Sequence, residues 1–168
     1  MLFLKRLTAY WLDCTLIAFL LIGFQWALYR ATDGFPFNHF EKGYQIELWV
    51  LLTFSLPVWL YFILSEMYKQ RTIGKKLLKL TISTDRETKI SWKQALIRTA
   101  VKLLPWELTH LIVLFPKPWW GIEEPENFFH IFIPNGLLVF YIVFFAWTKG
   151  TKGFHDQLAR TRVKELAK

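Results

Sequence analysis

Long runs of apolar residues dominate the chain and predict helices that cross a membrane. Three runs are clear, at residues 7–28, 48–64 and 128–147. The first is interrupted by one charge, Asp13, and the other two contain no Asp, Glu, Lys or Arg. Each supplies the roughly 17–25 residues that a helix needs to cross the hydrocarbon core. A secretory signal peptide is the alternative for the first run, but its acidic residue and the lack of a small-residue cleavage site favour a retained helix.

A fourth run, residues 95–115, is apolar on average but is interrupted by Arg98, Lys102, Pro105, Glu107 and His110. Lys and Arg are enriched in the cytoplasmic segments of membrane proteins, so their distribution decides whether this run crosses. With a span at residues 103–120, the cytoplasm receives sixteen of these cations: two before the first span, eight in residues 65–94 and six in residues 148–168. The external segments hold three. We therefore expect a single domain over residues 1–168, with four spans and both termini in the cytoplasm.

The segment between the second and third spans contains a weak strand pattern and a helix start. Residues 76–83 alternate weakly between apolar and polar, and residues 89–91 follow a turn signal, so we expect a short β-hairpin. Ser91 and Gln94 have capping-box spacing, which predicts a helix that begins at Trp92. We expect this amphipathic helix to lie along the inner membrane surface, with Arg98 and Lys102 facing the headgroups. Pro105 then turns the chain into the third span. The predicted fold class is an all-α integral membrane protein with four transmembrane helices, this β-hairpin and this amphipathic helix.

Composition supports a membrane protein and narrows its partners. The 168 residues are 54% hydrophobic, 18% aromatic and 20% charged. These values exclude a disordered chain and argue against a soluble domain, which averages about 45–50% apolar residues. We attribute the net charge of +8 to cytoplasmic loops that face anionic lipid headgroups, and we expect no nucleic-acid partner. Cys14 is the single cysteine, so no intramolecular disulfide forms.

The most informative polar residue is Asp13, which lies about 9 Å inside the first predicted span. A charge at that depth costs roughly 2.5–3.5 kcal/mol on insertion scales, so it must be paired, hydrated or protonated. Arg6 lies two helical turns earlier on nearly the same face, and its long side chain could reach partway toward the carboxylate. Two roles stay open for this pair: a structural clamp between helices, and an ion or proton site.

Four further polar residues are secondary candidates for such a site: Glu66, Arg98, Glu107 and His110. Glu107 and His110 are three residues apart and therefore share one helix face. Glu-x-x-His occurs in di-metal helix bundles, but those need the motif twice and two further carboxylates. We therefore expect a hydrated cavity or a structural pair here, and no metal.

Two motifs lie outside the predicted spans. Thr72, Gly74 and Lys75 resemble part of a phosphate-binding loop, but the earlier Gly and the Ser or Thr after the lysine are missing. We explain the basic run around them as a topology determinant, with binding of anionic lipid headgroups as a second use. Asp156 follows a turn at Gly153 and is expected to stabilise the first turn of a short helix. No G-x-S-x-G, H-E-x-x-H or Cys/His cluster occurs, so we expect neither enzymatic activity nor a cofactor.

Three stretches, in this order, resemble the RDD family of small membrane proteins, which is named for one arginine and two aspartates. The matching residues are Arg6 and Asp13 in the first helix, Thr72, Gly74 and Lys75 in the cytoplasmic segment, Arg98 after it, and Asp156 in the tail. The closing stretch, residues 154–163, departs from the family at Arg160, which stands where glycine is usual.

The resemblance implies a multi-pass protein of the cell membrane, of a type often suggested to act in transport, with some members reported as sodium/proton antiporters. Two functions compete. The first is a small secondary transporter that binds a monovalent cation or proton at Asp13, with Arg6 as a tuning charge. The second is a non-transporting accessory or scaffold protein in which Arg6, Asp13 and Asp156 hold the bundle together. Four short helices make a narrow pathway, so transport is expected to require a homo-oligomer.

Overall fold

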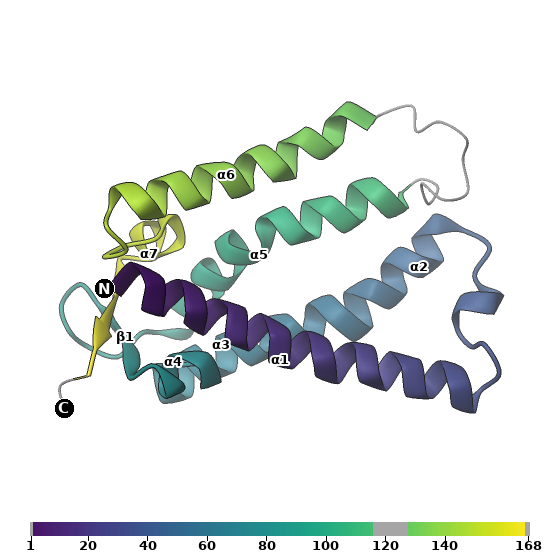
Figure 1. The fold of residues 1–168 in the computed structure, drawn as a ribbon, viewed down its shortest axis with the longest axis horizontal. Coiled ribbons are helices and arrows are strands. Elements are labelled where there is room, and N and C mark those ends of the chain that lie inside the picture. Colours follow the sequence, from purple (N-terminus) through teal and green to yellow (C-terminus); the bar gives the residue numbers. More distant parts are fainter. Residues whose placement is uncertain (1, 116–127, 167–168) are drawn as a thin grey trace.

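The computed structural model describes residues 2–115 and 128–166 and is mostly helical (Figure 1). Its elements in chain order are α1 (Leu2–Ala31), η1 (Phe37–His39), α2 (Gly43–Val50), the π-helical turn η2 (Leu51–Ser55), α3 (Leu56–Lys69), α4 (Ile73–Leu77), β1 (Leu80–Thr84), α5 (Trp92–Leu114), η4 (Phe128–Ile131), α6 (Phe132–Trp147), α7 (Phe154–Leu158) and β2 (Thr161–Glu165).

Three helical stretches are long and apolar enough to cross a membrane. They are α1, the continuous stretch Gly43–Lys69 formed by α2, η2 and α3, and Phe129–Trp147. At most 11% of the residues in the most apolar window of each are buried inside the protein. The apolar side chains that remain exposed need a second apolar solvent, which a bilayer supplies. These stretches confirm the three unambiguous runs of the sequence as candidate spans.

The fourth predicted span falls on α5, which carries several charges and is not among these candidates. Its start is as predicted: the Ser91 hydroxyl accepts from the Gln94 N–H at 3.3 Å, and the Gln94 side chain accepts from the Ser91 N–H at 3.0 Å. The helix then continues through Pro105 to Leu114. The expected surface helix and third span are therefore one helix within the described residues, and the predicted end at residue 120 lies outside them.

The predicted β-hairpin is wrong. β1 pairs antiparallel with β2 from the tail rather than with residues 89–91, and Ile82 stands opposite Val163 at the centre of the pair. Opposite residues of an antiparallel pair point to the same face, so this pairing buries two β-branched side chains together. They join an apolar cluster that also contains Ala9, Leu80, Ile90 and Ala95.

The short elements gather at one end of the molecule. In Figure 1, α4, β1, α7 and β2 lie beside the beginning of α1, and we call these four elements the cap. The apolar cluster fixes the cap to α1 through Ala9 and to α5 through Ala95. A second apolar cluster of Ile17, Phe62 and Leu103 joins α1, α3 and α5 farther from the cap. Ile63 and Met67 of α3 also pack against the first cluster, so the cap rests on α1, α3 and α5.

Candidate functional site

Asp156 in α7 stands at the centre of a buried ionic network beneath the cap. Its carboxylate is fully buried and accepts hydrogen bonds from Arg6 Nη2, from Arg98 Nη1 and, at 2.7 Å, from the Gly153 N–H. The Gly153 contact confirms the predicted role of Asp156 at the first turn of α7. Burial raises the pKa of Asp156, but the charges of Arg98 and Arg6 and the Gly153 N–H outweigh it and hold the pKa well below its usual range.

Arg6 does not approach Asp13 as predicted. Its Nη1 donates to the carbonyl oxygens of Gly150 and Thr151, at 2.9 Å each, while its Nη2 donates to Asp156. The turn after α6 brings these carbonyls to the first turns of α1. Arg6 therefore connects the beginning of the chain to its tail rather than to a carboxylate on its own helix.

Glu66, near the end of α3, binds three cations. Its Oε2 accepts from Arg98 Nε at 2.8 Å, and its Oε1 accepts from Lys75 Nζ at 2.7 Å and Lys102 Nζ at 3.0 Å. The expectation that Arg98 and Lys102 face lipid headgroups is wrong, because α5 packs on α3 along the face that carries them. Since Arg98 also binds Asp156, the two carboxylates belong to one continuous network.

Asp13 is held by neutral donors instead of by a cation. It accepts from the hydroxyls of Tyr61, at 2.6 Å, and Thr72, and from the Gly74 N–H at 2.7 Å. Glycine is required at position 74, because a Cβ there would lie 2.1 Å from the carbonyl oxygen of Ala9. These contacts join α1 to α3 and α4. The Thr72 and Gly74 motif of the sequence thus serves as the docking turn for Asp13.

A second buried polar cluster lies farther from the cap and connects α5 to α2, η2 and α3. His110 Nδ1 is 2.9 Å from Glu47 Oε2, and its Nε2 is 2.9 Å from Glu107 Oε2. Glu107 also accepts from Ser55 Oγ at 3.1 Å and from Trp59 Nε1 at 2.8 Å. The predicted pairing of Glu107 with His110 is therefore present, within a larger cluster.

The structure adds residues that sequence reasoning missed. Glu47 is one turn inside α2, and the predicted second span began only at the next residue, Leu48. Tyr61 was treated as part of an apolar run. Thr161, whose hydroxyl accepts a hydrogen bond from Arg98 Nη1, was treated only as part of the closing stretch at residues 154–163. Their role is set by partners on other elements, and the sequence holds no local signal for it. Among the described residues, no group of three or more His, Cys, Asp or Glu side chains could hold a metal ion.

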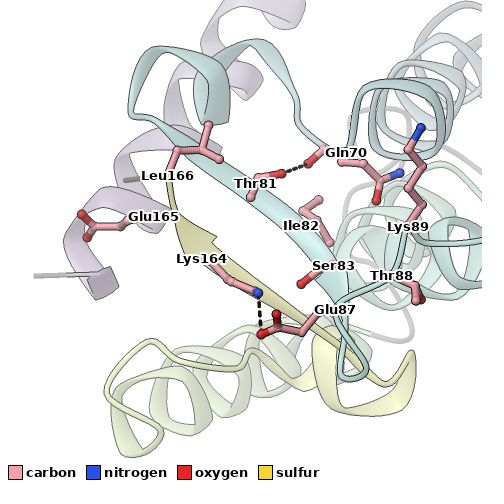
Figure 2. Close-up of a pocket in the computed structure, with 10 residues that line it drawn as sticks. All are labelled: Gln70, Thr81, Ile82, Ser83, Glu87, Thr88, Lys89, Lys164, Glu165 and Leu166. Carbon is pink, nitrogen blue, oxygen red and sulfur yellow. Dashed lines mark hydrogen bonds and ion pairs between the residues drawn. The ribbon is translucent and has the colours of Figure 1, made fainter. Parts of the chain in front are cut away.

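A pocket of about 330 Å³ lies against the two-stranded sheet (Figure 2). Its charged side chains are partly paired: Lys164 with Glu87 at 2.7 Å, and Glu165 with Lys5 at 2.6 Å. None of the site residues predicted from the sequence lines this pocket. The ionic network beneath the cap and the Glu47–His110–Glu107 cluster are therefore the stronger candidates for a functional site.

The comparison with protein families identifies the family of this chain. The family model described as the RDD family matches residues 2–160, which is nearly the whole chain. No curated protein and no solved structure matches significantly. Because the family model covers far more than half of the sequence, the chain belongs to the RDD family.

Proposed function

We propose that the protein is a small secondary transporter that exchanges a monovalent cation for protons across the cell membrane. RDD-family membership and three long apolar helices support a membrane protein. The observation that carries the transport proposal is that buried ionisable side chains lie at two levels along α3 and α5. Glu66 and Lys102 form the level nearer the cap, and Glu107 and His110 belong to the second level. Such residues are costly to place in a membrane, and in transporters they mark ion pathways and proton relays.

The two levels lie close together along α5. At the level nearer the cap, Glu66 binds Lys102, and at the second level Glu107 binds Trp59 and His110. Lys102 and Glu107 are five residues apart on α5, which corresponds to about 7.5 Å along the helix axis. On α3, Phe62 stands between Trp59 and Glu66 in the chain, is buried, and has its ring centre 4.2 Å from Lys102 Nζ. In this proposal, movement of the Phe62 ring connects the levels.

Asp13 has a structural role in this proposal. Three neutral donors hold its two oxygens and fix the turn at the start of α4. A transported cation would have to compete with all three donors. The second cluster, in which a histidine lies between two carboxylates, is better suited to change its protonation during a cycle.

The transport proposal includes an arrangement in the membrane. We propose that α5 provides a fourth crossing, that both termini lie in the cytoplasm, and that anionic headgroups surround the cap. Because four short helices leave little room for a pathway, we propose that a homo-oligomer transports. We also propose that the protein has no enzymatic activity, since its sequence carries no catalytic motif.

Purified protein in liposomes containing a pH-sensitive dye tests this function. Pulses of sodium, lithium or potassium outside the vesicles should change the internal pH, and protein-free vesicles should show no change. Absence of a response to all three cations, with protein that is folded and inserted, would contradict transport.

A non-transporting scaffold is the second candidate, and the number of elements that the ionic network joins favours it. Arg6, Arg98, Glu66 and Asp156 each bind at least two partners and tie α1, α3, α5 and the cap together. A scaffold needs such stability and no ion pathway. Stable protein without flux, together with loss of stability on breaking this network, would favour this second function.

A further inference from the structure

The geometry of the Glu47–His110–Glu107 cluster determines how many protons the cluster holds. Both ring nitrogens of His110 lie 2.9 Å from a carboxylate oxygen, one from each glutamate. Each contact needs one hydrogen, because two lone pairs at that distance repel. A neutral imidazole carries a single N–H, so it satisfies only one of the two contacts. Flipping the ring does not change this count, since both nitrogens face carboxylates.

The second hydrogen is an additional proton held between His110 and Glu47. On the other side, Glu107 accepts two further hydrogen bonds, from Ser55 and Trp59, which hold it as a carboxylate. Within the described residues, His110 is the only side chain that pairs with the Glu47 carboxylate. Imidazole is ordinarily more basic than a glutamate carboxylate, with reference pKa values of about 6.5 and about 4.3, so the proton rests on Nδ1.

We propose that Glu47, His110 and Glu107 form a proton-exchange site that opens toward the side of the membrane where α2 begins. Proton release breaks the Nδ1–H bond of His110, leaves the electron pair on that nitrogen and transfers the proton to water. The cluster then changes its net charge from −1 to −2, and Glu47 turns away from the ring. Rebinding reverses each step. The site deepens the transport function proposed above and rests on it only for the use of the proton.

The π-helical turn η2 supports this assignment independently. In a regular α-helix, residues eight apart, as Glu47 and Ser55 are, differ by about 80° around the axis. One extra residue in a π turn removes about 100°, which brings the two side chains within about 20° of each other. Both are buried and both belong to the cluster around His110. Without η2, the helix would not present them to α5 together, and such π turns are frequent at functional sites.

The other groups facing the cluster do not titrate in its place. Ser55 from η2 and Trp59 from α3 donate to Glu107, and the Trp106 ring of α5 lies 5.7 Å from the His110 ring. No Lys or Arg contacts the three titratable groups within the described residues. Glu47 is one turn from the beginning of α2, and its side chain is 9% exposed, compared with 20% for Glu107.

NMR of protein with 15N-labelled histidine in lipid nanodiscs tests the site without measuring transport. His110→Gln assigns the His110 signals among the four histidines. From about pH 5 to about pH 9, the Nδ1 signal of the wild type should change reversibly from protonated to unprotonated. In Glu47→Gln the amide N–H replaces the proton, so Nδ1 should stay unprotonated throughout. Glu41→Gln, an exposed change just before α2, should titrate like the wild type.

Two results would overturn the proposal: an Nδ1 signal that does not change with pH in the wild type, and an identical titration in Glu47→Gln. If His110 titrates as expected but liposomes show no flux, the site stands and the transport function fails. If liposomes show flux while His110 does not titrate, the transport function stands and the site fails.

Discussion

Arg6 and Asp156, 150 residues apart in the chain, form a buried ion pair that joins the first helix to the tail. Arg98 of α5 binds the same carboxylate, so α1, α5 and α7 meet at the Asp156 side chain. A network of this kind is strongly destabilised when one member is removed, because the partners stay buried and uncompensated. In this chain, Arg6 and Asp156 therefore hold the cap on the helices.

Asp156→Asn should unfold the protein at a markedly lower temperature in detergent, since Arg6 and Arg98 lose their shared counter-charge. We expect a cost of about 3–5 kcal/mol, as for other broken buried pairs. Glu165→Gln is the matched control, because Glu165 pairs with Lys5 at the exposed surface. The control should show no measurable change. Equal losses for the two variants would contradict the central place of Asp156.

Acid should destabilise the wild type through the same residue. The pKa of Asp156 is depressed in the folded protein, so its contribution to stability is complete above the ordinary aspartate value of 3.8. It is lost as the pH falls from there through the folded-state pKa. Thermal unfolding measured across this range should show a smaller acid dependence in Asp156→Asn than in the wild type. Parallel pH curves for the two proteins would rule this out.

Gly74→Ala should disrupt the docking of α4 on α1. The added Cβ would lie 2.1 Å from the Ala9 carbonyl oxygen, a backbone atom that cannot move away alone, and we expect a cost of about 1–3 kcal/mol. Gly23→Ala on α1 provides the comparison, because a Cβ added there would meet no atom within 4 Å beyond the backbone of its own helix. This second change should be neutral or stabilising. Detergent melting of both variants checks the difference, and similar melting temperatures would refute the close approach.

Both termini should lie in the cytoplasm, and the loop between α5 and α6 should lie outside. In a variant without Cys14, an impermeant thiol reagent added to intact cells should label a cysteine at position 124 but not one at position 168. This follows from the distribution of Lys and Arg, which favours the cytoplasm for the cap and tail. Labelling at position 168 would contradict the four-span arrangement.

Local and length-dependent features were predictable from the sequence. The three apolar runs determined the candidate spans, because crossing a bilayer requires a minimum helix length. The start of α5 was predicted by Ser91 and Gln94, since a capping box involves residues only three apart. Asp156 was also placed correctly at the first turn of α7.

The pairings that build the site join distant segments and could not be predicted in this way. The pattern in β1 was weak, and its partner lies about 80 residues later, where no turn signal links the two strands. Arg98 was expected to face lipid headgroups, because the sequence does not reveal that Glu66 and Asp156 converge on it. The role of Glu47 depends on the π turn, which realigns it with Ser55.

Cation-driven proton flux in liposomes, measured at equal amounts of folded wild type, Glu47→Gln and Glu41→Gln, tests the proposed transport and its proton site together. The wild type and Glu41→Gln should respond to at least one of sodium, lithium and potassium. Glu47→Gln, which removes the exchangeable proton but retains the side-chain shape, should not respond. Flux in Glu47→Gln equal to that of the wild type, or no flux in the wild type, would contradict proton-coupled transport through this cluster.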